Sequence, residues 1–336
     1  MKIKRNISLQ KFNTFGIDVK TKYFAEYESV EELNELLQSE EVSNNRLLQI
    51  GGGSNLLFLD DFDGIILHSR IKTIEIVDED MFSILLRVGS GVNWDYLVEY
   101  CVARDYYGIE NLSLIPGEVG ASAVQNIGAY GVEVKDRIES VEFIDIDTRK
   151  IHNFTNEQCK YGYRKSIFKE QLKGKIVITN VCFRLKKVAS YTLGYAHLKE
   201  AVLNKGEINL QNIRRTVIEI RARKLPDPKK LGNAGSFFMN PILSKSFYEK
   251  QLLSYPEMPH YPVSDTKVKI PAGWLIEHCD LKGKQFEKVA IYDKQALVIV
   301  NLGGASGKNV ADVASLVQIT VKKKFGIDIE PEVNFI

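Results

Sequence analysis

Cysteine and histidine are scarce in this chain of 336 residues, and their spacing argues against disulfide and metal chemistry. The four cysteines lie far apart and form no C-x-x-C pair, a spacing typical of reduced thiols rather than of a disulfide framework or a zinc site. The five histidines include no pair at positions i and i+4. We therefore expect no metal site, and we expect a reducing compartment, the cytoplasm.

The sequence also lacks long apolar runs and an excess of charge of one sign. No run of about 18 apolar residues occurs, so no segment is expected to span a bilayer. The formal net charge of +2 offers no basic field for nucleic acid or for an anionic membrane surface. No apolar stretch follows the basic amino terminus, so we expect no signal peptide. We therefore expect neither nucleic acid nor a membrane as a partner.

Composition and hydrophobic periodicity predict an α+β protein of more than one domain. Hydrophobic residues make up 44% of the chain and charged residues 26%, which is enough to bury real cores. Strand-like and helical patterns follow one another without a regular βαβ alternation; the strands are expected at 141–146, 176–185 and 295–302, the helices at 94–102, 213–220 and 310–325. The proline-rich break at 226–228 is the best candidate for a domain boundary.

Three successive glycines, Gly51, Gly52 and Gly53, follow an apolar run that is typical of a strand. Without side chains, such a loop can turn its backbone N–H groups toward a phosphate, and Ser54 and Asn55 could add donors. A plain strand-to-loop turn explains the glycines equally well. No lysine follows the loop as in a P-loop, and no long helix opens on it as in a Rossmann motif.

A second stretch dense in small residues runs from Ile115 to Gly131. Its glycines and alanines suit backbone wrapped tightly around a flat or charged ligand. A loose surface loop is a poorer explanation, because Val119, Val124 and Ile127 are apolar. Together with the glycine loop, this stretch indicates a buried site for a phosphate-bearing ligand.

Four side chains could carry chemistry, and each also has an ordinary explanation. Arg164 stands between aromatic residues; it could clamp a carboxylate bidentately or simply stack on a tyrosine at the surface. Ser236 is flanked by Gly235, but Phe238 two positions on excludes a nucleophile elbow, so a turn or helix cap is the alternative. Lys224 could meet an anionic substrate or remain a solvated charge. The apolar carboxyl terminus is expected to fold back, which could hold Glu332 near a site.

Taken together, these segments resemble the UDP-N-acetylenolpyruvoylglucosamine reductase family of flavoenzymes. The likeness runs from Asn13-Thr14-Phe15-Gly16 to the last residues. It includes the loop 51–56, the stretch 115–131, Tyr163-Arg164-Lys165-Ser166-Ile167-Phe168-Lys169, the segment 232–241, Ala272-Gly273-Trp274-Leu275-Ile276 and Glu330-Pro331-Glu332-Val333. Each motif is moderately specific, and six in the order of the family are highly specific.

The resemblance implies a two-part FAD-binding module of the vanillyl-alcohol-oxidase (PCMH) type, followed by a smaller α+β substrate-binding domain. We expect the module at about 16–187, with one subdomain at 1–66 and a second at 67–222. The substrate domain would span 223–325, and a carboxyl-terminal segment, 326–336, would return to the active site. FAD would be noncovalent, because the glycine loop contains no histidine that could tether it.

The implied activity is the reduction of UDP-N-acetylglucosamine enolpyruvate to UDP-N-acetylmuramate by NADPH, a step in peptidoglycan precursor synthesis. Arg164 and Glu332 would stabilise the negative charge that develops on the substrate, and Ser236 would protonate its α-carbon. Glu332 can do so only when protonated or bridging through hydrogen bonds. We expect a monomer whose partner is this small molecule.

The resemblance also assigns binding residues. For FAD they are Gly51, Gly52, Gly53, Ser54, Asn55, Leu56, Pro116, Gly117, Gly120, Ala121, Ser122, Gln125, Asn126, Gly128, Ala129, Tyr130 and Gly131. For the sugar nucleotide they are Tyr163, Tyr195, Lys224, Asn240, Tyr261, Lys282 and Gln295. The segment around Tyr195 resembles an extra loop of one subtype, whose tyrosine covers the diphosphate.

Two departures from the family pattern affect expected contacts. Met239 stands where many relatives carry lysine, and Asn334 stands where arginine often follows the terminal acids. Two other functions share the flavin module. A sugar or alcohol oxidase would need the loops 51–56 and 115–131 but not Ser236 or Glu332. A non-enzymatic flavin- or nucleotide-sensing module would not need Arg164 either.

Overall fold

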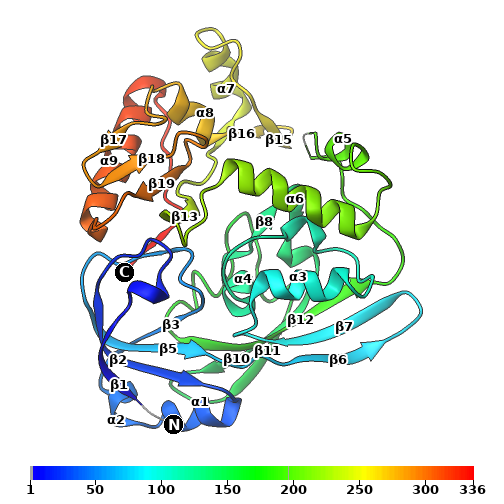
Figure 1. The fold of residues 1–336 in the computed structure, drawn as a ribbon, viewed down its shortest axis with the longest axis vertical. Helices are drawn as coiled ribbons and strands as arrows, with labels where there is room; N and C mark the ends of the chain where they lie inside the picture. The colour runs from blue at the N-terminus through cyan, green and yellow to red at the C-terminus, as the bar shows by residue number, and fades with distance from the viewer. Residues whose placement is uncertain (1–2, 196) are drawn as a thin grey trace. The chain divides into compact units, whose positions relative to one another are not determined.

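The computed structural model describes residues 3–195 and 197–336, which form two compact units. The first unit comprises the residues up to Ile7, Thr21–Gly53 and Phe62–Arg221. The second comprises Ser8–Lys20, Ser54–Asp61 and Ala222–Ile336. Figure 1 colours the chain by residue number and labels its elements. The chain therefore passes between the units more than once.

A four-stranded sheet forms the amino-terminal part of the first unit, in the order β1-β2-β5-β3. Its strands are β1 (Lys4–Ser8), β2 (Lys20–Tyr27), β5 (Phe62–Ser69) and β3 (Arg46–Ile50). β5 runs parallel to both β2 and β3. The glycine loop, residues 51–53, directly follows the carboxyl end of β3. The helices α1 (Val30–Leu36) and α2 (Glu40–Ser43) contribute Leu33, Leu36 and Val42 to the core of this sheet.

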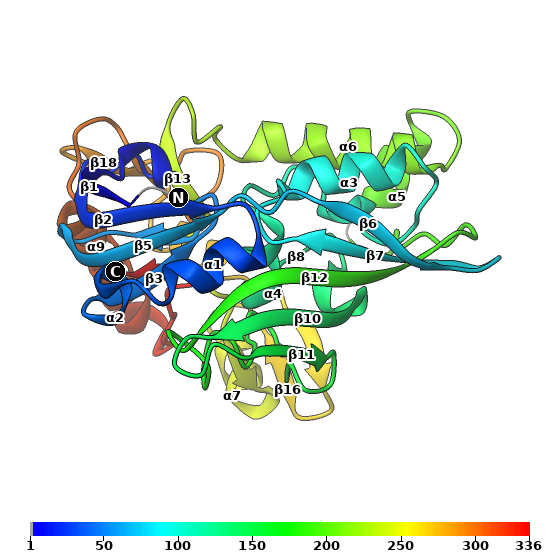
Figure 2. The ribbon, with the colours of Figure 1, turned by 90° about the horizontal axis from the view of Figure 1, so that it is seen from below.

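An antiparallel five-stranded sheet forms the second large part of the first unit, in the order β11-β10-β12-β7-β6 (Figure 2). The strands are β11 (Ile151–Thr155), β10 (Ile138–Asp145), β12 (Ile176–Lys186), β7 (Ser83–Gly89) and β6 (Ile74–Glu79). The predicted strands at 141–146 and 176–185 are thus confirmed. Helix α3 (Trp94–Val102) begins after Asn93, whose side chain accepts from the Tyr96 amide, as its periodicity predicts. Trp94 packs edge-on against Phe183 of β12, with ring centroids 6.0 Å apart.

Helix α4 (Val119–Gln125) packs on β12 and β7 and contacts η3, and several further elements complete the first unit. They are η2 (Glu110–Leu112), the hairpin β8 (Gly128–Ala129) and β9 (Val132–Glu133), η3 (Val134–Asp136), α5 (Leu198–Leu203) and most of α6 (Leu210–Lys224). The helix predicted at 213–220 is α6. It ends before Pro226 because proline cannot continue a helix.

The second unit contains a four-stranded antiparallel sheet, β13-β19-β18-β17, and a three-stranded sheet, β14-β16-β15. The strands of the first are β13 (Gly232–Ser236), β19 (Val298–Asn301), β18 (Val289–Ile291) and β17 (Gln285–Phe286). Those of the second are β14 (Ile242–Ser244), β16 (Lys267–Lys269) and β15 (Tyr261–Ser264). The predicted strand at 295–302 is shorter, because Gln295 accepts the Val298 amide in a turn before β19 begins.

Helices α7 (Lys245–Leu252), α8 (Ala272–Glu277) and α9 (Gly307–Phe325) complete the second unit, together with η1 (Gln10–Phe12). α9, red in Figure 1, packs on β18 and β19 and ends at Gly326, whose φ of +68° makes it a left-handed cap. This confirms the helix predicted at 310–325. Within residues 3–195 and 197–336, every helix is too short or too polar to cross a membrane.

The carboxyl terminus of the second unit pairs with the strand that follows the glycine loop. β20 (Asn334–Phe335) runs parallel to β4 (Leu56–Leu57). The amide of Asn334 donates to the Asn55 carbonyl at 3.0 Å, and the amide of Ile336 donates to the Leu57 carbonyl at 2.9 Å. The last residues are therefore part of the fold, as their apolar character predicts.

Candidate active site

The two small-residue segments predicted to hold a cofactor meet in the first unit. A Cβ added to Gly52 would lie 3.2 Å from Gly117 Cα, and one added to Gly51 would lie 3.3 Å from Ala121 Cβ. Gly52 thus faces the backbone of Gly117, whereas Gly51 faces the side chains of Ala121 and Glu118, and a side chain at either position would crowd the other segment. Gly53 has a φ of +62°, which a residue with a side chain adopts at a cost.

Helix α4 fixes the second of these segments against Ser90 and Val92, in the turn that follows β7. The amides of Val119 and Gly120 donate to the carbonyls of Val92 and Ser90, at 2.9 and 3.0 Å. A Cβ on Gly120 would lie 2.7 Å from Ser90 Cβ, so the contact requires glycine. Ser122 is buried, and its hydroxyl donates to the Val119 carbonyl. The predicted cofactor residues of α4 are thus held by short backbone contacts.

A tight hairpin follows α4 and carries the rest of the predicted cofactor residues. Tyr130 and Gly131 connect β8 to β9 with φ values of +49° and +82°, as in the two-residue turns that match the twist of a hairpin. Asn126, at the end of α4, is fully buried. Its side chain donates to the Gly162 carbonyl at 2.8 Å and accepts from the Lys135 amide. Burial raises the pKa of Tyr130, whose phenol therefore remains protonated.

Arg164 lies against this hairpin, so the structure brings one of the three predicted catalytic residues to the predicted cofactor segment. Its guanidinium donates to the carbonyls of Asn126 and Gly128, at 3.2 and 2.7 Å. The guanidinium also lies 5.4 Å from the ring centre of Tyr163. Sequence reasoning left open whether Arg164 merely stacks on a tyrosine. The structure contains that stacking together with a two-pronged hydrogen bond to the hairpin.

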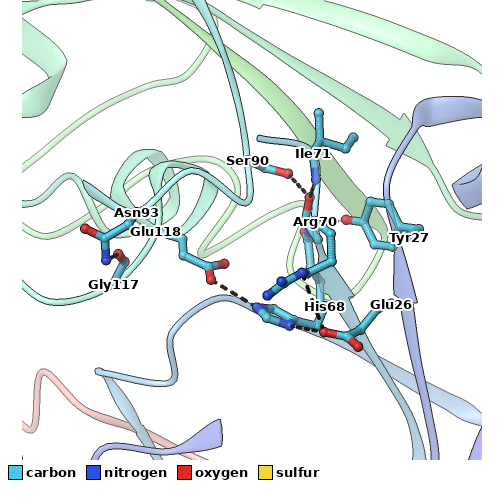
Figure 3. Close-up of polar contacts among 11 residues, drawn as sticks. Glu26, Tyr27, His68, Arg70, Ile71, Ser90, Asn93, Gly117 and Glu118 are labelled. Atoms are coloured by element: carbon cyan, nitrogen blue, oxygen red, sulfur yellow. Dashed lines mark hydrogen bonds and ion pairs between the residues drawn. The ribbon is translucent and has the colours of Figure 1, made fainter. Parts of the chain in front are cut away.

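His68, on β5, contacts two acidic side chains, and no sequence motif predicts this arrangement. Figure 3 shows its ring between Glu26 and Glu118; Nδ1 lies 3.3 Å from Glu26 Oε1, and Nε2 lies 3.0 Å from Glu118 Oε1. His68 therefore bridges two carboxylates, one from β2 and one from the residue before α4. The other oxygen, Glu118 Oε2, is buried and has no hydrogen-bond partner among residues 3–195 and 197–336.

Glu118 Oε2 also lies 3.3 Å from where a Cβ on Gly51 would stand. Glu118 therefore connects His68 to the point where the two cofactor segments meet. The sequence contains no pattern that singles out a histidine within the buried strand β5, or a glutamate between glycines. Only the pairing of distant segments identifies these residues.

Tyr195 stands beside the same hairpin. Its ring packs edge-on against Tyr130, with centroids 5.9 Å apart, and 40% of the residue is exposed. A Cβ on Gly131 would lie 3.5 Å from Tyr195 Cβ and 3.6 Å from Thr192 Cγ2. The segment 191–195 thus lies along the turn of the hairpin.

The second unit holds the other two predicted catalytic residues close together along the backbone. Ser236 ends β13, opposite Val298, after Gly235 with a φ of +67°. The next residue, Phe237, accepts the Glu332 amide at 2.8 Å, and Phe238 pairs with Pro331. Asn55 donates from its side chain to the Glu332 carbonyl at 3.1 Å. The backbone of Glu332 is therefore held both by Phe237, the residue after β13, and by Asn55, the residue before β4.

The predicted substrate residues of the second unit occupy several elements. Asn240 accepts the Ala272 amide and so caps the start of α8. Gln295 lies beside the same helix, 3.2 Å from where a Cβ on Gly273 would stand. Lys282 forms an ion pair with Glu277 at 2.6 Å. Tyr261 is 43% exposed on β15, and Lys224 is exposed at the end of α6.

The residues present fit a flavin dinucleotide better than a metal ion. The close approach of Gly51 and Gly52 to the segment 117–121 makes a cradle that any Cβ would fill, as expected where backbone must contact phosphates and ribityl oxygens. Within residues 3–195 and 197–336, no group of three or more His, Cys, Asp or Glu side chains is placed to hold a metal.

Two family models match the chain one after the other. A model described as "FAD binding domain" matches residues 21–154, and one described as "UDP-N-acetylenolpyruvoylglucosamine reductase, C-terminal domain" matches residues 227–336. The crystal structure of UDP-N-acetylenolpyruvylglucosamine reductase from Thermus caldophilus has the same fold, with a TM-score of 0.69 at 24% identity. It covers 100% of this chain and 99% of its own. The predicted fold class, a PCMH-type flavin module followed by a smaller α+β domain, is confirmed.

Full-length relatives are more similar still. Proteins named UDP-N-acetylenolpyruvoylglucosamine reductase from Bacteroides fragilis, Porphyromonas gingivalis and Flavobacterium johnsoniae are 52%, 49% and 45% identical to the chain. The first alignment covers 99% of this chain and the other two 100%, and all three cover 100% of the relative. The chain therefore belongs to the UDP-N-acetylenolpyruvoylglucosamine reductase family.

Proposed function

We propose that this protein uses FAD and NADPH to reduce UDP-N-acetylglucosamine enolpyruvate to UDP-N-acetylmuramate, a step in peptidoglycan precursor synthesis. The observation that carries the proposal is full-length similarity, up to 52% identity, to proteins named for this reductase. The glycine cradle formed by residues 51–53 and 117–121 supports the choice of cofactor. When bound, the flavin supplies a site that accepts a hydride from the nicotinamide and passes it on.

The first task of the protein is to bind the dinucleotide without a covalent bond. We propose that residues 51–56 and the predicted residues of 116–131 contact FAD mainly through backbone N–H groups. The close approach of Gly52 to Gly117 supports this assignment, since a Cβ on Gly52 would lie only 3.2 Å from Gly117 Cα. Glu118 joins this set, because its carboxylate lies at the same contact.

Charge stabilisation on the substrate is assigned to Arg164 and Glu332. Adding hydride to the β-carbon of the enolpyruvyl group leaves negative charge at the α-carbon, delocalised into the adjacent carboxylate. A preorganised cation is the strongest device for such charge. The hydrogen bonds of Arg164 to Asn126 and Gly128 support its role, because they fix the plane of the guanidinium before substrate binds. Glu332 would act as a protonated or hydrogen-bond-bridging acid, since a bare carboxylate would repel that charge.

Protonation of the α-carbon is assigned to Ser236. Its hydroxyl would give up one proton to the carbanion, forming a C–H bond, and would recover a proton from solvent afterwards. A serine is a weak acid, which suffices here because the carbanion is a strong base. The Glu332 amide donates a hydrogen bond to the Phe237 carbonyl, and Phe237 follows Ser236. This contact supports the proposal that Glu332 and Ser236 act on the same substrate.

The sugar nucleotide would be bound by Tyr163, Tyr195, Lys224, Asn240, Tyr261, Lys282 and Gln295. We propose that the flavin module lies within about 16–187, in parts 1–66 and 67–222, that 223–325 binds the substrate, and that 326–336 returns to the active site. We further propose a monomer in the cytoplasm. The four free cysteines support a reducing compartment.

Anaerobic half-reactions test the proposal. Purified protein should contain FAD that heat releases into the supernatant, and NADPH should reduce it. Adding UDP-N-acetylglucosamine enolpyruvate without oxygen should reoxidise the flavin with one equivalent of product formed. Reduction by NADPH without reoxidation by this substrate would refute the assigned reaction. Reduction of the flavin by a sugar or alcohol would instead identify an oxidase.

A further inference from the structure

Asn111 joins two segments of the first unit that the sequence analysis assigns to different ligands. It lies in η2 (Glu110–Leu112) and is 0% exposed. Its side-chain amide donates to the Tyr130 carbonyl at 2.8 Å and to the Thr192 carbonyl, also at 2.8 Å. Tyr130 belongs to the hairpin assigned to FAD, and Thr192 belongs to the segment that carries Tyr195. One amide group thus holds both backbones.

The geometry requires an amide at this position. Two carbonyls need two N–H donors on one atom, which asparagine supplies and aspartate or leucine does not. The remaining oxygen, Oδ1, is buried and has no hydrogen-bond partner within the described parts of the chain, 3–195 and 197–336. A buried acceptor without a partner lowers the stability of the folded state. The two hydrogen bonds donated by the same amide group offset this loss.

The short helix η2, which carries Asn111, is held by several hydrogen bonds. The Leu112 carbonyl accepts from the indole of Trp94 at 2.9 Å. The hydroxyl of Ser113 donates to the Glu110 carbonyl at 2.6 Å, and the Glu110 carboxylate accepts the Gly108 amide at 2.7 Å. The amide of Asn111 therefore projects from a rigid turn.

The segment that it holds is also attached by packing. Tyr191 packs edge-on against Tyr107, with centroids 5.7 Å apart, and Tyr195 packs edge-on against Tyr130. Leu193 packs against the apolar cluster formed by α5 and α6. Apolar packing is not directional, whereas two short hydrogen bonds to one amide fix the register of the backbone. Asn111 thus contributes a directional constraint on the position of Tyr195 along the hairpin.

We propose that Asn111 is a positioning residue for the substrate: it fixes the Thr192 backbone to the Tyr130 backbone and so places Tyr195 over the flavin-binding hairpin before substrate arrives. The proposal rests on the proposed function for the assignment of Tyr195 to the sugar nucleotide. Preorganisation of this kind lowers the entropic cost of binding and leaves the chemical step unchanged.

A double-mutant cycle with Tyr195 tests the proposal. Asn111→Asp keeps the size of the side chain and replaces the two donors by an oxygen that the carbonyls repel. It should raise KM for the enolpyruvyl substrate about tenfold, the loss expected from one or two ordinary hydrogen bonds, with kcat and the FAD content near wild type. In a Tyr195→Ala background the same change should have little further effect on KM. Additive losses in KM would show that Asn111 does not act through Tyr195.

Asn156 offers a matched control in the same unit. Its side-chain amide also donates to two backbone carbonyls, those of Lys135 and Ile138, both at 2.7 Å. Neither carbonyl belongs to the Tyr195 segment. Asn156→Asp makes the same chemical change, so it should lower stability without raising KM. An equal rise in KM for both variants would refute the specific role of Asn111.

Limited proteolysis supplies a readout that does not depend on turnover. Chymotrypsin should cut the FAD-bound Asn111→Asp protein after Tyr191, Leu193 or Tyr195 faster than it cuts wild type or Asn156→Asp, because the segment is no longer held. Equal cutting rates would overturn the proposal even if the reductase activity is present. If wild type shows no reductase activity, the proposed function fails, and the cutting rates still decide whether Asn111 holds the segment. Asn111→Leu provides the same comparison without a new charge.

Discussion

Gly120 is the residue at which α4 touches the segment after β7, and replacing it by alanine tests how the flavin cradle is built. The new methyl group would lie 2.7 Å from Ser90 Cβ and 3.4 Å from the Ser90 carbonyl oxygen. Carbon atoms in contact lie about 3.5–4.0 Å apart, so α4 or the segment around Ser90 would have to move by about 1 Å. That shift would stretch the bond from the Gly120 amide to the Ser90 carbonyl, now 3.0 Å.

The expected size of the effect follows from three contributions. Overpacking costs about 1–3 kcal/mol. The weakened hydrogen bond costs about 1 kcal/mol more. Alanine has a higher helix propensity than glycine, which stabilises the folded state by about 1 kcal/mol. Gly120→Ala should therefore destabilise the protein by about 1–3 kcal/mol, measured by urea unfolding without FAD. Because Gly117 and Glu118 lead into the same helix, the affinity for FAD should fall about tenfold or more.

Two further variants separate packing from a general effect of losing glycine. Gly194→Ala is the control, because no described atom lies within 4 Å of the new methyl group. It should leave stability and FAD affinity unchanged. Ser90→Gly removes the Cβ that the new methyl group meets and should partly restore FAD affinity to Gly120→Ala. Wild-type FAD affinity in Gly120→Ala, measured by quenching of flavin fluorescence, would refute the account of the cradle.

Other predictions concern chemistry and pH. Ser236→Ala should leave flavin reduction by NADPH near wild type and slow the second half-reaction by about 10²–10⁴-fold; equal losses in both halves would make Ser236 structural. Arg164→Lys keeps a charge but loses the fork to Asn126 and Gly128, so kcat should fall at least tenfold in steady-state assays while FAD stays bound. Burial alone would raise the pKa of Asp95, but bonds from the Arg214 guanidinium and the Leu114 amide hold it below its usual range. Ionised Asp95 therefore stabilises the folded protein fully at pH values above the pKa of an unfolded aspartate. This stabilisation is lost as the pH falls through the lower pKa of Asp95 in the folded protein. The stability difference between wild type and Asp95→Asn, measured by urea unfolding, should shrink as pH falls from neutral toward 3.

The elements that the sequence predicted correctly have signals within a few neighbouring residues. Helix α3 has apolar residues at helical spacing behind Asn93, and α9 ends at a glycine, so local patterns suffice. β12 is rich in apolar residues on both sides of Thr179 and Asn180, because it lies inside its sheet. The two cofactor segments were identified by their glycines. That Gly52 meets Gly117 was not visible, because no periodicity relates the two.

Single side chains that act through distant partners escaped the sequence analysis altogether. His68 and Glu118 look ordinary in the sequence, and only the folded chain brings His68 Nε2 to 3.0 Å from Glu118 Oε1. Asn111 is likewise one asparagine among many, and its importance follows from two carbonyls that come from segments far along the chain. Such residues are determined by tertiary contacts, which composition and spacing do not encode.

The position of Glu332 illustrates how much of the proposed chemistry depends on the far end of the chain. Toward the amino-terminal side of Glu332, the Met239 amide donates to the Glu330 carbonyl at 2.9 Å. Toward the carboxyl side, Asn334 and Ile336 donate to the strand that follows the glycine loop. Glu332 is thus held between two backbone ladders, although Pro331 beside it removes one possible donor. These hydrogen bonds join the segment after Ser236 to residues 55–57 within the second unit, so the backbone position of Glu332 depends on both segments.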